Sequence, residues 1–267
     1  MSVSARQSWS GSRIGRLSRF VVISPHLDDA ALSLGGTIAR ATRTGAAVTV
    51  VTVMAGAPER DVPAGAWDRR CGFSSAREAL GQRLREEARA CWVLGAQSRR
   101  LPFADEQYAT DRDESAIWTA LEPELVGTEA VLLPGWPLLQ SDHRCVSETV
   151  LAHLGPDVQV GIYVEQPYAV WEAAGPPELS SRILRRLQQA VRHPAAVDRQ
   201  RPRAAEPSLD GQPVEWEVVP LTLADQAAKL RAVRAYRSQL RGFGPGFITQ
   251  IMLYARADGG EPIGWAN

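Results

Sequence analysis

Apolar segments alternate with segments of helical periodicity along most of the chain. Short apolar runs, several of them rich in valine, predict buried strands at residues 20–24, 47–54, 130–133, 158–164 and 214–221. Apolar positions at helical spacing predict helices at residues 31–42, 75–95, 141–154, 178–192 and 222–240. Because a parallel return between strands needs a crossover, this order predicts one α/β domain with a mostly parallel sheet and helices on both faces, a Rossmann-like three-layer sandwich.

Two segments lack this pattern. Residues 1–18 are rich in serine and arginine without an apolar run, which predicts a flexible N-terminal tail before a domain at residues 19–267. Residues 193–213 contain almost no large apolar residues, which predicts a mobile surface loop. The chain has neither an apolar run of membrane-spanning length nor the apolar core of a secretory signal.

Composition narrows the class of protein. The 267 residues are 45% hydrophobic, which is ample for a sizeable core. Lys+Arg and Asp+Glu both number 30, so no overall field attracts nucleic acid or a membrane surface. The three cysteines show no CxxC spacing, which argues against a disulfide framework and a thiolate zinc site. We therefore expect a soluble, cytoplasmic protein without a nucleic-acid or membrane partner.

The first predicted strand ends in a cluster of possible metal ligands. Residues 20–37 read F-V-V-I-S-P-H-L-D-D-A-A-L-S-L-G-G-T, so His26, Asp28 and Asp29 follow the strand directly. Ligands of open parallel sheets bind at the carboxyl ends of strands, and zinc accepts imidazole nitrogen and carboxylate oxygen. His26 and Asp29 can both point inward, which leaves Asp28 to act as a general base. Such a cluster is also typical of a turn or a helix cap.

A catalytic zinc site needs a third protein ligand, and the chain has only four histidines. His143 follows the strand predicted at residues 130–133 and opens a helix, which places it at the same sheet edge as His26. We therefore expect His26, Asp29 and His143 to bind one zinc ion per chain. Asp142 could orient a ligand or the base from behind, but it or Ser141 could equally cap the helix.

Four segments carry a family pattern in a fixed order across residues 18–240: P-H-L-D-D-A-A-L-S-L-G-G, Q-R-L-R-E-E-A-R-A-C-W-V-L-G, L-P-F-A-D-E and K-L-R-A-V-R-A-Y-R-S-Q. Together they resemble the LmbE-like, or PIG-L-like, N-deacetylases. Members of that family are zinc hydrolases that remove acyl groups from N-acetylglucosaminyl compounds. One such segment alone would be weak support, whereas four in order are specific.

The resemblance implies roles for individual residues. It makes His26, Asp29 and His143 the zinc ligands and Asp28 the general base. Arg83 and Asp105 match positions that contact the polar substrate in relatives. From the residues alone, Arg83 could equally form a surface salt bridge, and Asp105 could equally hold a turn. Two further matches, Lys229 and Tyr236, are interpreted as packing or interface positions.

The chain departs from the family pattern in one segment near the site. Relatives commonly read D-x-H-P-D-H where residues 138–143 read L-L-Q-S-D-H, so Gln140 replaces a histidine assigned to transition-state stabilisation or acid catalysis. Glutamine can donate a hydrogen bond to an oxyanion but cannot deliver a proton. Asp28 must then act as both base and acid. The loss of this histidine also favours an alternative, a non-catalytic relative that binds a sugar or a partner.

The resemblance also narrows the substrate. It implies an N-acetyl or other N-acyl group on an N-acetylglucosamine-type unit of a larger natural product or glycoside, as in antibiotic biosynthesis. An amide of a thiol conjugate is the alternative. Three tryptophans in predicted loops near the catalytic edge are candidates for contact with the sugar or its aglycone: Trp67, Trp136 and Trp171.

Overall fold

The computed structural model describes residues 9–58, 60–109, 111–169, 208–209, 212–257 and 259–266. Its centre is a seven-stranded sheet with the order β3-β2-β1-β4-β5-β9-β8. The strands are β1 (Arg19–Ser24), β2 (Ala47–Thr52), β3 (Gln97–Arg100), β4 (Ala130–Trp136), β5 (Gln159–Val164), β8 (Glu215–Pro220) and β9 (Gly260–Trp265). The first five in this order are parallel, and β9 is antiparallel to both β5 and β8. The predicted fold class is therefore confirmed.

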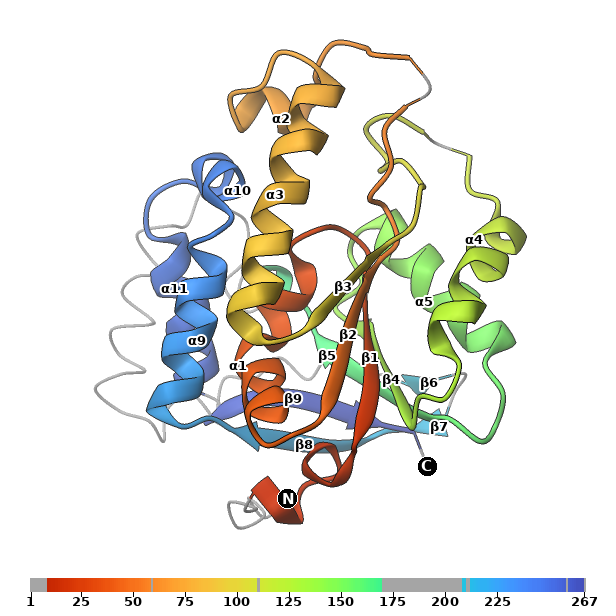
Figure 1. Cartoon of the computed structure of the whole chain (residues 1–267), viewed down its shortest axis with the longest axis vertical. Helices are drawn as coiled ribbons and strands as arrows, with labels where there is room; N and C mark the ends of the chain where they lie inside the picture. Colours follow the sequence, from red (N-terminus) through yellow and green to blue (C-terminus); the bar gives the residue numbers. More distant parts are fainter. Residues whose placement is uncertain are drawn as a thin grey trace.

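Helices cover both faces of this sheet (Figure 1). They are α1 (Asp29–Arg43), α2 (Ala66–Arg70), α3 (Ala76–Leu94), α4 (Glu114–Leu121), α5 (Ser141–His153), α9 (Leu223–Val233), α10 (Arg237–Phe243) and α11 (Phe247–Ala257). The helices α1, α3 and α9 pack together on one face, and α4 and α5 pack on the other. Among the described residues, every helix is too short or too polar to cross a lipid bilayer.

Capping side chains fix the ends of the best-predicted helix. The Ser75 side chain accepts a hydrogen bond from the Glu78 backbone, and Gly95 ends α3 with a φ of 73°. The helix predicted at residues 222–240 is wrong in one respect, because the structure divides it into α9 and α10. The reason is Glu86 of α3, whose carboxylate accepts hydrogen bonds from the backbone nitrogen and the hydroxyl of Ser238 and so starts a new helix there.

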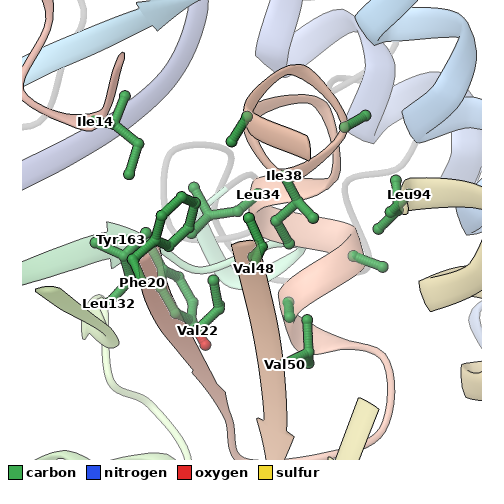
Figure 2. Close-up of a cluster of buried hydrophobic side chains, with 14 of the residues drawn as sticks. Ile14, Phe20, Val22, Leu34, Ile38, Val48, Val50, Leu94, Leu132 and Tyr163 are labelled. Carbon is green, nitrogen blue, oxygen red and sulfur yellow. The ribbon is translucent and has the colours of Figure 1, made fainter. Parts of the chain in front are cut away.

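The larger hydrophobic cluster fills the space between the sheet and the helices α1, α3 and α9 (Figure 2). Most of its labelled members come from β1, β2, β4 and β5 and from two of these helices: Phe20, Val22, Val48, Val50, Leu132, Tyr163, Leu34, Ile38 and Leu94. A second cluster lies beneath α4 and α5 on the other face. Burial on both faces explains why the central strands read as continuous apolar runs.

The N-terminal segment differs from its prediction. Residues 9–18 contain two 3-10 turns, Trp9–Gly11 and Ile14–Arg16, and Ile14 is fully buried in the larger cluster. The flexible tail is therefore wrong for residues 9–18, because two apolar side chains without periodicity, Ile14 and Leu17, are enough to dock the segment. Residues 1–8 lie outside the described residues.

The loop predicted at residues 193–213 lies mostly outside the described residues, as do the helix predicted at residues 178–192 and Trp171. At its end, β6 (Ser208–Leu209) and β7 (Gln212–Pro213) form a separate antiparallel pair.

Candidate metal centre

Two neighbouring strands deliver the candidate ligands to one edge of the sheet. β1 pairs with β4 in parallel, so the carboxyl ends of both strands lie side by side. His26 follows β1 in a short turn, and Asp29 is the first residue of α1. His143 lies in the first turn of α5, which follows β4. Residues more than a hundred positions apart thus meet where ligands of parallel sheets bind.

The three side chains form a compact triangle. His26 Nδ1 lies 3.4 Å from Asp29 Oδ2, His143 Nε2 lies 3.3 Å from the same oxygen, and the two ring nitrogens are 3.1 Å apart. Zinc bonds of about 2.0–2.1 Å in a tetrahedral arrangement place ligand atoms about 3.3 Å apart. Two imidazoles and one carboxylate are also ligands that zinc accepts. Both the geometry of the group and the types of its side chains therefore suit a divalent metal ion.

A buried carboxylate lies behind each imidazole. Asp142 Oδ2 is 3.0 Å from His26 Nε2, and Glu165 Oε2 contacts His143 Nδ1. Asp142 and Glu165 are 0% and 1% exposed. Carboxylates in these positions accept the ring N–H and leave the other nitrogen of each imidazole facing the triangle. Asp142 is thus placed to orient the His26 ring and does not cap α5, whose N-cap is Gln140 without a side-chain cap bond.

The charged groups of the cluster shift one another's pKa values. Burial alone would lower the pKa of His26, but hydrogen bonds to Asp142 and Asp29 outweigh it and raise this pKa well above its ordinary value. Burial is likewise outweighed at His143, where Asp29 and Glu165 raise the pKa to about 9. Against burial, His143 and His26 hold the pKa of Asp29 well below its usual range. The negative charge of Asp29 therefore favours positive charge on the two imidazoles beside it.

Asp28 lies beside the triangle in the wall of the same cavity. It is the N-cap residue of α1, is 9% exposed, and makes no side-chain cap bond. Burial, followed by the charge of Asp29, raises the pKa of its carboxyl to about 6, against the opposing effect of Arg83. A carboxyl group that exchanges its proton near neutral pH suits general acid and base catalysis.

The triangle opens into a cavity of about 550 Å³, which is within the usual range for small-molecule sites. Gln140, Arg83 and Asp105 contribute polar side chains to its wall. Aromatic side chains contribute much of the rest: Trp67, Tyr168, Tyr236, Phe243 and Phe247. The cavity thus combines a polar reaction centre with apolar surfaces.

Arg83 forms a buried ion-pair network. Its Nη1 donates to Asp105 Oδ2 at 3.3 Å, and its Nη2 donates to Asp68 Oδ1. The Arg83 side chain is only 12% exposed, so the alternative of a surface salt bridge is wrong. Asp105 also accepts a hydrogen bond from the Gln107 backbone at 3.0 Å and therefore holds a turn as well. Sequence reasoning missed Asp68, because α2 lies in a stretch that it placed in a loop.

The remaining predicted residues divide between the cavity and its surroundings. Gln140 lines the cavity, and its Nε2 donates to the Tyr168 hydroxyl at 2.5 Å. Trp67 lines it as well, with its indole nitrogen 2.7 Å from Gln239 Oε1. Trp136 ends β4, where its carbonyl oxygen accepts from the Glu165 backbone nitrogen at 2.7 Å, and it is not among the lining residues. The sequence analysis did not predict a role for Glu165. This residue follows β5 directly, as His26 follows β1, at the edge of the sheet where ligands bind.

Comparisons with known proteins place the chain in a family. The model of the family described as GlcNAc-PI de-N-acetylase (PIG-L) matches residues 21–154, half of the chain. A 2'-N-acetylparomamine deacetylase of Streptomyces fradiae is 31% identical over 171 residues, and the match spans 58% of this chain but only 59% of that relative.

Solved structures extend the likeness to nearly the whole chain. A deacetylase of the A40926 pseudoaglycone has a TM-score of 0.72 and 26% identity over 93% of this chain and 96% of its own. The zinc-inhibited form of teicoplanin deacetylase has the same fold, with a TM-score of 0.71 and 22% identity over 93% of this chain and 98% of its own. The family model includes the segments that carry His26, Asp29 and His143, and the protein belongs to the GlcNAc-PI de-N-acetylase (PIG-L) family.

Proposed function

We propose that the protein is a zinc-dependent N-deacetylase that hydrolyses an N-acetyl or other N-acyl group on an aminosugar. The observation that carries this proposal is the triangle of His26 Nδ1, Asp29 Oδ2 and His143 Nε2, with atoms 3.1–3.4 Å apart and Asp28 beside it. Membership of the PIG-L family supports the same class of reaction.

The metal ion and the protein side chains have different roles in the proposed reaction. When bound, Zn²⁺ supplies Lewis acidity, which polarises an amide carbonyl and lowers the pKa of water towards about 7. His26, Asp29 and His143 would hold it, while Asp142 and Glu165 keep the two rings oriented from behind. This arrangement leaves Asp28 free for proton transfer.

Asp28 takes the proton of the attacking water and returns it to the departing amine nitrogen. The water oxygen forms the new bond to the carbonyl carbon, the C–N bond breaks, and the products are a carboxylate and a free amine. Asp28 suits both steps because burial raises its pKa to about 6, so both protonation states are accessible near neutral pH. No histidine is available at position 140 to share this work.

Gln140 stabilises the oxyanion in this proposal. An amide nitrogen carries two hydrogens, so Gln140 can hold the Tyr168 hydroxyl with one and donate the other towards the cavity. Donors aimed at developing negative charge are worth about 10² to 10³ in rate. Gln140, held by Tyr168, thus takes the position of the family histidine without supplying a proton.

The substrate class follows from the cavity and from the relatives. The cavity of about 550 Å³ has aromatic walls next to the reaction centre, so it accommodates more than a single sugar ring. Relatives include deacetylases of 2'-N-acetylparomamine and of the A40926 pseudoaglycone. We therefore expect an aminosugar unit of an antibiotic intermediate as the substrate.

The test combines metal analysis with a substrate panel. The purified chain should contain about one zinc ion, lose activity with a chelator, and regain it with one equivalent of Zn²⁺. Because one teicoplanin deacetylase structure is a zinc-inhibited form, zinc is titrated through and beyond one equivalent, beside Co²⁺ and Mn²⁺. The panel contains N-acetylglucosamine, an aryl N-acetylglucosaminide, 2'-N-acetylparomamine, the A40926 pseudoaglycone and an N-acetylated thiol conjugate. A folded chain that binds no metal and releases no acyl group would refute the proposal.

A further inference from the structure

Arg112 holds the carboxylate that lies behind His26. Its Nε donates to Asp142 Oδ1 at 2.8 Å, and its Nη2 donates to the same oxygen. The other oxygen, Oδ2, accepts from His26 Nε2 at 3.0 Å and from the Glu106 backbone nitrogen at 2.9 Å. Each carboxylate oxygen therefore has two partners, and the Arg112 fork fixes the orientation of the group.

This contact matters because Asp142 is 0% exposed. A carboxylate without water contact needs a counter-charge and several donors, and the planar guanidinium fork defines its orientation better than a lysine could. With Oδ1 held by Arg112, Oδ2 faces His26 Nε2. The hydrogen of the imidazole then belongs on Nε2, and Nδ1 faces Asp29 and His143.

We propose that Arg112 is a positioning residue for the metal centre, acting through Asp142 on His26. This inference rests on the proposed function, since it assumes that the three ligands bind zinc. Arg112 precedes α4, its side chain is 15% exposed, and it is not among the residues that line the cavity. It therefore influences the metal without touching the substrate.

A purely structural role is the competing explanation. Arg112 Nη1 also donates to the carbonyl oxygen of Ala109 at 2.5 Å, so the side chain ties down the segment that precedes α4. A tether of this kind would affect folding but would not depend on the Asp142 carboxylate. The two explanations therefore differ in whether the effects of changing Arg112 and Asp142 are additive.

The experiment is a double-mutant cycle on zinc affinity. The dissociation constant of zinc is measured by chelator competition for the wild type, Arg112→Met, Asp142→Asn and the double variant. Changing a group behind a metal ligand costs about 10-fold to 100-fold in affinity, which is the loss expected for Arg112→Met. In the Asp142→Asn background, the same change should cost less than about threefold. Replacing zinc by Co²⁺ should also show an altered visible absorption spectrum in Arg112→Met.

Two further variants make the test specific. Arg112→Lys keeps the charge but not the fork, and it should weaken zinc binding about threefold to tenfold, which also serves the cycle if Arg112→Met does not fold. Arg100→Met removes a comparable ion pair with the buried Glu87, at 2.5 Å, and should leave zinc affinity within about twofold. An equal loss of affinity in Arg100→Met would mean a general loss of stability and would overturn the inference.

The remaining outcomes separate this inference from the proposed function. A wild type that binds zinc beside an Arg112→Met variant of equal affinity overturns the inference alone. An additive cycle also overturns it, because Arg112 would then act as a tether. A folded wild type that binds no zinc overturns the proposed function, and the inference with it.

Discussion

Glu165 lies directly behind His143, with its Oε2 in contact with Nδ1 of the ring, whereas Nε2 faces His26 and Asp29. Its other oxygen, Oε1, accepts from the Leu138 backbone at 2.8 Å, so the carboxylate is held at both ends. Removing its charge weakens its hold on the imidazole hydrogen. We predict that Glu165→Gln binds zinc about 10-fold to 100-fold more weakly than the wild type, measured by chelator competition.

The matched control for Glu165 is Glu217→Gln. Glu217 is 9% exposed and accepts from the Trp265 indole at 3.0 Å, far from the metal centre in the fold. It should lose some stability and keep its zinc affinity. If both variants bound zinc equally well, Glu165 would have no part in holding the ligand.

The pH dependence of activity should reflect the protonation of the Asp28 carboxyl group. Burial, followed by the charge of Asp29, raises the pKa of its carboxyl to about 6, and the group must be deprotonated to act as a base. The value of kcat/KM should therefore fall about tenfold per pH unit below the pKa of Asp28 and level off above it. A bound cation favours the charged carboxylate, so it moves this fall in activity to lower pH.

The direct test of the same residue is Asp28→Asn. It should lower kcat by about 10² to 10⁴ and keep its zinc, because the amide cannot take a proton. Zinc content and kcat are measured on the same preparation. Turnover at the wild-type rate would show that another group moves the proton.

The stability of the metal-free protein should fall as the pH rises from about 6.5 to 9. Burial would lower the pKa of His143, but Asp29 and Glu165 raise it to about 9, so the charged imidazole stabilises the fold. That stabilisation is complete below the unfolded pKa of about 6.5 and is lost as the pH rises through about 9, a change of roughly 3 kcal/mol.

Zinc should remove this pH dependence, because it binds the neutral imidazole. The stabilisation that zinc gives should therefore grow across the same pH window, and zinc binding should release protons. Urea unfolding of the metal-free and zinc-loaded protein at several pH values measures both effects. A His143→Gln variant without metal should show a smaller slope. A slope equal to that of the metal-free wild type would assign the titration elsewhere.

The sequence was sufficient to predict most of the sheet and the residues of the triangle. Buried parallel strands read as apolar runs, and their carboxyl ends share one edge, so His26 and His143 could be placed together without coordinates. The same rule applies to Glu165 after β5, but a single glutamate in a loop is not distinctive. β3 and β9 were missed because the first is a polar edge strand and the second contains two glycines and a proline.

The contacts that sequence reasoning did not find depend on irregular backbone. Asp68 reaches Arg83 from α2, and Arg112 reaches Asp142 from the segment before α4. Neither segment has a periodicity that fixes the direction of its side chains. Trp136 shows the converse case, since its place near the catalytic edge was predicted but the cavity does not include its side chain. A position along the chain predicts an edge of the sheet, whereas packing decides which side chains face the site.

The helix that carries Asp29 is held by a buried ion pair at its middle. Lys229 Nζ lies 2.6 Å from Glu261 Oε1 and 3.2 Å from the Ser33 carbonyl, and Glu261 also accepts from the backbone nitrogens of Gly36 and Thr37. Removing one partner leaves an uncompensated charge, so Lys229→Met should destabilise the fold by about 3–5 kcal/mol in urea unfolding. Arg99→Met, from a half-exposed pair with Glu124, should cost less than about 1 kcal/mol.

The partner variant separates charge from packing. Glu261→Gln keeps an acceptor for the α1 backbone, and in the Lys229→Met background it also removes the unpaired charge. The double variant should therefore be more stable than Lys229→Met alone, a non-additivity that a loss of packing would not produce. If the double variant were less stable than either single one, the buried charge would not be the cause.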